Sequence, residues 1–384
     1  MASVMSLTAL GIDLMLPAFG AMRASLGLAP DSTAVASLIT AYFIGLAVPQ
    51  LVYGALADRF GRKPVLVGGA VIYGIGAVGS ALAPTLPALL LARFVWGCGA
   101  AGTRVVSVAI IRDTYAGDQM ARAMSTIMAV FVLVPVVAPS AGAGLLTLMP
   151  WRGLFAVCAG CAAAVLFWSW RLPESWPEER RADLRWASTW QALLEVARCR
   201  VTVGYIIAMT FMFGGFVSYL ASSELIVSAI FKRGAQFPII FGVVAAVLGV
   251  ASLANGRLVK CVGIARLMWP LLGAYILAAT ATVVVAVAAD GQPSFWLFFP
   301  LLTTTLIAHM MLIPNMNSIA MEPVGHIAGV ASAVIGTVTS AGGAVLGAAI
   351  DHQVVATVTP LAVGLLSAAV LSALTVAWIQ RPTA

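Results

Sequence analysis

Long apolar stretches, separated by short polar gaps or by gaps rich in glycine and proline, run through almost the whole chain. Most are twenty or more residues long, the length that an α-helix needs to cross a bilayer. Strands of a transmembrane barrel would instead give short alternating segments. A soluble domain would have about a quarter charged residues, whereas 9% of this chain is charged and 61% is hydrophobic. The sequence therefore predicts an all-α membrane protein.

Twelve spans are predicted, with boundaries at polar residues or at glycine and proline. They cover residues 2–23, 33–56, 64–83, 87–112, 121–146, 152–171, 202–223, 236–256, 266–289, 295–321, 327–350 and 357–379. An even number of spans places both chain ends on one side of the membrane. Most of the 21 Lys and Arg residues fall in the loops on that side, so the positive-inside rule predicts cytoplasmic termini.

The basic residues that give the net charge of +7 lie mainly between the spans. Their expected partners are membrane lipid head groups, and no nucleic-acid partner is predicted. The first apolar stretch contains Asp13 and has no Lys or Arg before it. We therefore expect a retained first span rather than a cleaved signal peptide.

The longest polar stretch divides the spans into two sets of six. We expect an N-terminal half over residues 1–171, a cytoplasmic linker over 172–200 and a C-terminal half over 201–384. Within the linker, residues 184–198 could form an amphipathic helix on the inner membrane surface; a solvated loop is the alternative. The apolar face of that helix would carry Trp186, Trp190, Leu193, Leu194 and Ala197.

The two halves contain related loops at matching positions. Gly54, Leu56 and Gly61 recur, at the same spacing, as Gly256, Leu258 and Gly263. Two six-span repeats around a ligand site near the membrane midplane are an architecture of secondary transporters. The chain is therefore expected to be a transporter, and no catalytic constellation of an enzyme is found in it.

Three motifs make the chain resemble a known family. The segment 54–64, GALADRFGRKP, is similar to the G-x-L-x-D-R-x-G-R-[RK] signature of the major facilitator superfamily. Asp13-Leu-Met-Leu-Pro17, Arg93-Phe-Val-Trp-Gly97 and Pro139-x-x-Gly142-x-Gly144 resemble the drug:proton antiporters, and the bicyclomycin/chloramphenicol-resistance branch most closely. The resemblance covers essentially the whole chain. It implies twelve helices in two pseudo-symmetric halves and export by alternating access.

The first motif also has a physical interpretation as a gate. Gly54 and Gly61 permit a tight turn and close helix approach, and Asp58 offers negative charge near the start of the following helix. Arg59 and Arg62 would anchor the loop at the inner surface. An ordinary positive-inside loop is the alternative.

The fifth span contains two prolines, and the second belongs to the Pro139–Gly142 motif. A proline removes a backbone hydrogen bond, and a glycine lets a neighbouring helix approach, so a bent and closely packed helix is expected. Ala138 departs from the family pattern, which usually has glycine there. A purely structural kink is the alternative to a gating role.

Residues 97–102, GCGAAG, fit the G-x-G-x-x-G pattern of dinucleotide-binding proteins. That pattern binds a pyrophosphate only between a strand and a helix start, whereas these glycines lie within an apolar span. We therefore expect helix packing.

Charged side chains within spans mark the expected proton path. Asp13 is the one carboxylate near the middle of a predicted span, and such a group is costly unless it faces the protein interior. Arg93 and Arg104 lie eleven residues apart, nearly on one face of the fourth span, so either could approach Asp13. The resemblance assigns proton coupling to Arg93. A structural ion pair for Asp13, and an Arg104 that extends toward the inner surface, are the alternatives.

Aromatic and thioether side chains suit a pocket that accepts several drug shapes. Any one of them could equally face lipid or pack within the protein, and Asn315 could instead bond to backbone freed by Pro314. The candidate substrate-binding residues are Tyr42, Phe43, Met128, Phe213, Phe216, Tyr219 and Asn315.

These observations lead to one predicted function. We expect a monomeric multidrug or phenicol exporter of the bacterial inner membrane, exchanging small apolar drugs for protons and conferring antibiotic resistance. It would need no cofactor beyond the proton gradient. The alternative is a transporter of the same fold that carries a metabolite such as a sugar or an amino acid.

Overall fold

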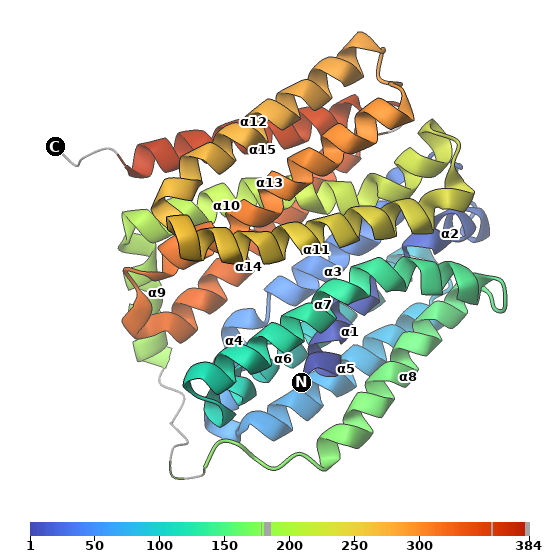
Figure 1. Ribbon diagram of the computed structural model, residues 1–384. Coiled ribbons are helices and arrows are strands. Elements are labelled where there is room, and N and C mark those ends of the chain that lie inside the picture. Colours follow the sequence, from blue (N-terminus) through green and yellow to red (C-terminus); the bar gives the residue numbers. More distant parts are fainter. Residues whose placement is uncertain (178, 180–185, 355, 381–384) are drawn as a thin grey trace. The chain divides into compact units, whose positions relative to one another are not determined.

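The computed structural model describes residues 1–177, 179, 186–354 and 356–380. The side chains of residues 118, 121, 125, 128 and 186–189 also lie outside the description. Within the described residues the regular structure is entirely helical (Figure 1). The chain forms two compact units, of which the first contains residues 1–28 and 37–191 and the second contains residues 29–36 and 192–384.

The first unit begins with a broken helix and continues with six further helices. Its elements are α1 (Ala2–Asp13), η1 (Leu16–Ala18), α2 (Phe19–Ser25), α3 (Ser37–Ala47), α4 (Gln50–Phe60), α5 (Arg62–Leu82), α6 (Leu86–Thr114), α7 (Gly117–Leu146) and α8 (Trp151–Trp170). Helix α9 (Trp186–Arg198) leads from this unit into the second. It lies within the predicted amphipathic segment, whose residues 184 and 185 fall outside the described part.

The second unit contains six long helices and several short helical turns. Its elements are η2 (Thr33–Ala36), α10 (Arg200–Leu225), the π-helical η4 (Ile226–Ile230), η5 (Gly234–Gln236), α11 (Phe237–Val262), α12 (Ile264–Ala288), α13 (Phe295–Met321), η6 (Gly325–Ile327), α14 (Ala328–Asp351) and α15 (Thr359–Ile379).

The number of spans agrees with the prediction. Among the described residues, eleven helical segments are long and apolar enough to cross a membrane, and α3 with α4 makes a twelfth, bent by 40°. Pro49 explains the bend, because it has no N–H to donate to the carbonyl of Gly45. The second span also continues to Phe60, four residues beyond its predicted end.

The first span is interrupted, which differs from the single helix expected over residues 2–23. Helix α1 ends at Asp13, and a 3₁₀ turn over Leu16–Ala18 precedes α2. Pro17 cannot donate to the carbonyl of Asp13, so the α-helical pattern cannot continue through this point. The break therefore places Asp13 at a helix end within the span.

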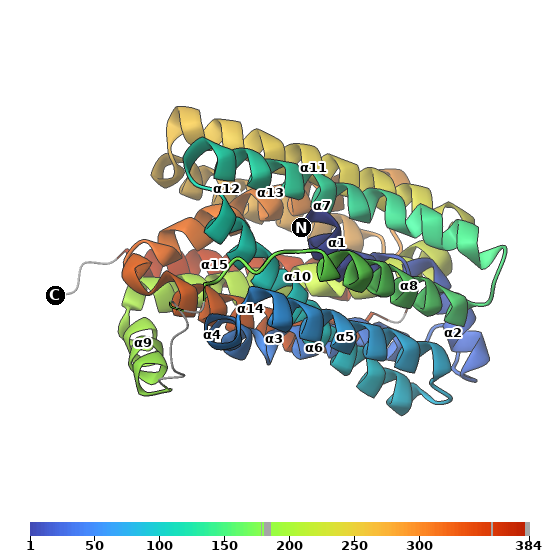
Figure 2. The same ribbon diagram turned by 90° about the horizontal axis from the view of Figure 1, so that it is seen from below.

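The GCGAAG segment packs helices together, as predicted. A Cβ atom at Gly97 would stand 2.1 Å from the carbonyl oxygen of Tyr42, and one at Gly99 would stand 2.1 Å from the backbone nitrogen of Tyr73. Only glycine permits such contacts. Helices α5 and α6 accordingly lie side by side (Figure 2).

Candidate functional site

Helix α1 is held through its backbone carbonyls. Tyr73 of α5 donates from Oη to the oxygen of Leu7 at 2.7 Å, and Tyr42 of α3 donates to that of Thr8 at 3.0 Å. Arg93 Nη1 of α6 donates to the oxygen of Gly11 at 2.8 Å. Three helices thus fix the part of α1 that leads to the break.

Asp13 lies at this break, and the side chain is buried, with 4% of the residue exposed. Among the described residues, it forms no ion pair with Arg93 or Arg104. The structural ion pair, which the sequence left open as the alternative to proton coupling, is therefore absent within the part of the chain that the structure describes. Asp13 stands as a buried carboxyl group at the end of a helix.

Arg93 is fully buried within a cage of aromatic rings and carbonyls. Its Cζ lies 4.6 Å from the ring centroid of Tyr42 and 4.6 Å from that of Trp96. Its Nε is 3.5 Å from the oxygen of Leu38, and Nη2 has no hydrogen-bond partner among the residues that the structure describes. Stacking and backbone hydrogen bonds therefore stabilise this cation in place of a carboxylate. Arg104, on the same helix, is exposed instead.

Tyr42 and Phe43, two of the three candidate substrate residues of the first unit, serve packing in this structure. Tyr42 is fully buried and hydrogen-bonded to α1, and Phe43 is 7% exposed. Their rings meet edge to face at 6.2 Å. Met128 belongs to α7, but its side chain lies outside the described part of the structure.

The second unit brings three of its candidates into one aromatic row on α10. Phe216 lies between Phe213 and Tyr219, with ring centroids 6.2 and 6.3 Å away. His309 of α13 stacks on Phe216 at 5.4 Å, and Phe241 of α11 stacks on Tyr219 at 6.0 Å. Because Phe213 and Phe216 are half-buried, this row presents an adaptable apolar surface.

The amide group of Asn315, the remaining candidate for substrate binding, is hydrogen-bonded within the protein. Asn315 of α13 and Asn255 of α11 exchange two hydrogen bonds, each 3.1 Å long, and both residues are buried. Both of the amide's functional atoms are therefore used in joining α11 to α13. The sequence left open a hydrogen bond from Asn315 to the backbone near Pro314. The side chain bonds to Asn255 instead.

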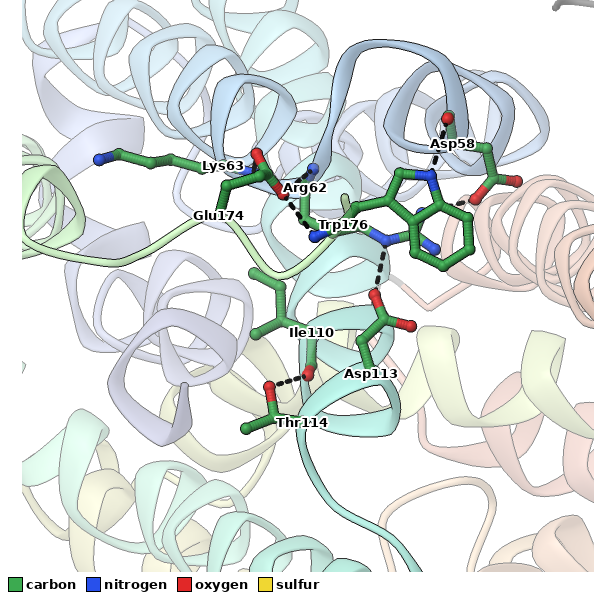
Figure 3. A network of polar contacts seen from close by, with 8 residues as sticks. All are labelled: Asp58, Arg62, Lys63, Ile110, Asp113, Thr114, Glu174 and Trp176. Atoms are coloured by element: carbon green, nitrogen blue, oxygen red, sulfur yellow. Dashed lines mark hydrogen bonds and ion pairs between the residues drawn. The ribbon is translucent and has the colours of Figure 1, made fainter. Parts of the chain in front are cut away.

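A polar network surrounds Arg62 at the junction of α4 and α5 (Figure 3). Arg62 Nη1 lies 2.7 Å from Asp58 Oδ1, and its Nε lies 2.8 Å from Asp113 Oδ2. Trp176 stacks on the guanidinium group at 4.4 Å and donates from Nε1 to the oxygen of Asp58 at 3.1 Å. The loop motif is therefore tied to the end of α6 and to the chain that follows α8.

The negative charge at the start of α5 comes mainly from Glu174. Its Oε1 accepts a hydrogen bond from the backbone N–H of Arg62 at 2.9 Å, and its Oε2 accepts one from Lys63 at 3.1 Å. These are N–H groups that a helix start leaves unpaired. Asp58, which the sequence placed in this role, binds the Arg62 side chain instead.

The predicted glycines of this loop have different roles. Gly61 has φ 97° and ψ 159°, a conformation that side-chain-bearing residues rarely adopt, so the turn requires glycine. At Gly54, a Cβ atom would meet nothing within 4 Å. The close approach expected there is therefore not observed. Arg59 is exposed, with its Cζ 5.2 Å from the ring of Phe60.

The Pro139–Gly142 motif of α7 meets the broken first span. Pro139 lies within the helix. A Cβ atom at Gly142 would stand 2.2 Å from the carbonyl oxygen of Leu14, whereas one at Gly144 would meet nothing within 4 Å. The motif therefore places glycine where α7 touches the residue that follows Asp13.

One buried carboxyl group was not singled out from the sequence. Asp351 ends α14, is 4% exposed, and accepts a 2.8 Å hydrogen bond from Ser218 of α10. The other oxygen, Oδ2, is buried and has no hydrogen-bond partner within the described ranges of the chain. An aspartate beside an apolar span is visible in the sequence. It was passed over because the eleventh span was expected to end at residue 350, one residue earlier.

Comparison with known proteins supports the same assignment as the motifs. A sequence model described as Major Facilitator Superfamily matches residues 1–348. The chain is 28% identical over 354 residues to a bicyclomycin resistance protein homolog of Haemophilus influenzae, covering 91% of this chain and 87% of that protein. It is 34% identical over 194 residues to a chloramphenicol resistance protein of Pseudomonas aeruginosa, covering 50% and 44% respectively.

Solved structures show the fold. The xylose transporter XylE from E. coli, in a partially occluded inward-open conformation, aligns with a TM-score of 0.73 and 14% identity, covering 99% of this chain and 96% of that one. The human organic anion transporter MFSD10 aligns with a TM-score of 0.69 and 17% identity, covering 99% and 97%. Family match and fold agree: this multi-pass membrane protein belongs to the major facilitator superfamily.

Proposed function

We propose that this chain exports small, mostly apolar drugs in exchange for protons, by alternating access. The names of the relatives support drug efflux, and the excess of basic residues in alternate loops supports cytoplasmic termini. We further propose that it acts as a monomer in the bacterial inner membrane. Its two six-span halves would be joined by the linker over residues 172–200.

The buried carboxyl group of Asp13 carries the proposal of proton coupling. A carboxylate within a span is costly unless a cation or hydrogen bonds compensate it, and Asp13 forms no ion pair within the described residues. A carboxyl group that is buried in one state and hydrated in another takes up a proton in one and releases it in the other. The helix break beside Asp13 is a position where such a change of access can occur.

Arg93 would act as a positioning residue for this step. It is bonded to the oxygen of Gly11, two residues before Asp13, so it fixes the end of α1 without neutralising the acid. We propose that drug contacts come from the aromatic row of Phe213, Phe216 and Tyr219. The exposed cation of Arg104 would favour neutral or zwitterionic compounds over lipophilic cations.

Drug uptake into inside-out vesicles under an imposed pH gradient tests the coupling. Asp13→Asn should abolish gradient-driven accumulation of a phenicol while leaving downhill exchange of the drug. Asp31→Asn, which changes an exposed loop acid, is the matched control and should behave as the wild type. Full gradient-driven uptake by Asp13→Asn would refute the role of this residue.

The same preparation separates drug from metabolite transport. Proton release on adding a phenicol to detergent-solubilised protein is expected for the exporter. A response to one sugar or amino acid, with none to any drug, would instead establish the alternative function within the same fold.

A further inference from the structure

An apolar groove lies between α11 and α13 on the surface of the second unit. Its volume is about 460 Å³. The walls include Ile239 and Val243 from α11 and Phe299, Pro300 and Thr303 from α13. The Thr303 hydroxyl is bonded to its own helix at the oxygen of Phe299, 2.7 Å away, so the groove surface is apolar. A hydrocarbon chain is the kind of group that such a surface accepts.

The groove opens toward lipid along its length. Ile239 is 68% exposed and Val243 is 58% exposed, and both lie within the span Gly234–Val262. Side chains of this kind on the outside of a membrane helix contact acyl chains. The groove is therefore within reach of lipid rather than of a water-soluble molecule.

A cation closes one end of the groove. The Cζ of Arg233 lies 4.6 Å from the ring of Phe295 and 5.4 Å from that of Trp296, and Nη1 donates to Gln236 Oε1 at 3.1 Å. The backbone of Arg233 is also fixed, because its N–H donates to the oxygen of Val227 at 2.8 Å. The guanidinium group is thus held in place at the groove entrance.

This cation forms no ion pair within the described residues. Its recorded side-chain bond is to the neutral amide of Gln236, and the neighbouring Lys232 is exposed. Among the described residues, no acid forms an ion pair with Arg233 or Lys232. The planar guanidinium therefore keeps donors for the oxygens of a phosphate group.

The position along the membrane matches a lipid head group. Arg233 directly precedes the span Gly234–Val262, and Phe295 begins the span of α13. Basic and aromatic residues at span ends lie at the level of the head groups. The apolar groove extends from this point into the hydrocarbon layer.

We propose that an anionic phospholipid occupies this groove, with an acyl chain between α11 and α13 and its phosphate on Arg233. A second groove, of about 390 Å³, lies between α4 and α5, and no charged residue lines it. That groove should accept acyl chains without preference for the head group. The proposal concerns lipid binding and is independent of which compound is transported.

Native mass spectrometry of the detergent-solubilised full chain tests the site, with phosphatidylglycerol and phosphatidylcholine offered in equal amounts. The wild type should retain phosphatidylglycerol several-fold more than phosphatidylcholine. Arg233→Gln should lose this preference, while Arg233→Lys should keep part of it. Val243→Phe, which fills the groove, should reduce the retention of both lipids.

Lys232→Gln is the matched control, because it removes a neighbouring charge that does not line the groove. It should retain the wild-type preference. An equal loss of the preference for phosphatidylglycerol in Lys232→Gln and Arg233→Gln would mean that the lipid is attracted by net charge alone. That result would overturn the proposed site. An unchanged preference in Arg233→Gln, or full displacement of the lipid by inorganic phosphate alone, would also overturn it. Size-exclusion profiles confirm that each variant is folded.

Discussion

Gly142 of α7 touches the backbone oxygen of Leu14, the residue directly after Asp13. A Cβ atom at position 142 would stand 2.2 Å from that oxygen. The proline–glycine motif and the buried acid therefore meet at one point, although they are more than a hundred residues apart in sequence. Movement of α7 would be transmitted to the end of α1 through this contact.

Replacing Gly142 by alanine should separate α7 from the break. Overpacking of this kind costs about 1–3 kcal/mol, so we expect a lower melting temperature in detergent and slower drug uptake. Gly144→Ala is the control on the same helix, where the added methyl group meets no atom within 4 Å. Equal effects of the two substitutions would contradict a specific contact at Leu14.

Replacing Arg93 by lysine should weaken the hold on α1. An ammonium group cannot reproduce the planar stacking on Tyr42 and Trp96 together with the bond to Gly11. We expect a loss of about 1–3 kcal/mol of stability and a marked fall in transport, measured by thermal melting and proteoliposome uptake. Arg104→Lys, at an exposed position of the same helix, should melt as the wild type does. A stable and fully active Arg93→Lys would show that only the charge matters.

The two acids bound to Arg62 should contribute unequally. The side chain of Asp113 is 15% exposed and that of Asp58 is 52% exposed. An exposed ion pair contributes about 0.2–1 kcal/mol, whereas a charged hydrogen bond that is partly shielded from water contributes up to about 1.5–3 kcal/mol. Asp113→Asn should therefore lower the melting temperature more than Asp58→Asn.

Salt provides an independent check on this difference. The effect of Asp58→Asn should shrink as the salt concentration rises, because exposed pairs are screened. The effect of Asp113→Asn should persist. If Asp58→Asn lowered the melting temperature more than Asp113→Asn at high salt, burial would not determine how much each acid contributes to the network.

The Asn255–Asn315 pair should behave as one structural unit. Asn315→Ala leaves the amide of Asn255 buried without its partner, at a cost of about 1–3 kcal/mol. The double alanine variant should be more stable than the sum of the single effects predicts. Drug affinity, measured by equilibrium binding, should change equally in either single variant. A loss of affinity confined to Asn315→Ala would restore its role in substrate binding.

Hydropathy was sufficient to predict most of the helices. The predicted span 295–321 and helix α13, Phe295–Met321, coincide. The break at Asp13 was not predicted, although Pro17 signals it, because proline is tolerated in membrane helices and hydropathy does not register a missing N–H. The bend at Pro49 was missed for the same reason.

The partners of the polar residues were beyond local patterns. Glu174 binds the backbone of Arg62 across 112 residues of sequence, and no periodicity indicates that distance. Asp113, the second acid bound to Arg62, likewise lies 51 residues away in sequence. Asn315 could be chosen as a candidate from the sequence, whereas its pairing with Asn255 depends on how α11 and α13 cross.

The hydrogen bonds that hold α1 also affect which side chains of α1 can change during evolution. Tyr73, Tyr42 and Arg93 grip main-chain oxygens, which every residue type supplies. Leu7 and Thr8 could exchange side chains, within the space available, without releasing the helix, whereas a Cβ atom at Gly11 would stand 3.2 Å from Tyr73 Oη. Related transporters could therefore change their substrate preference through substitutions on α1 while the hydrogen bonds that hold this helix are kept.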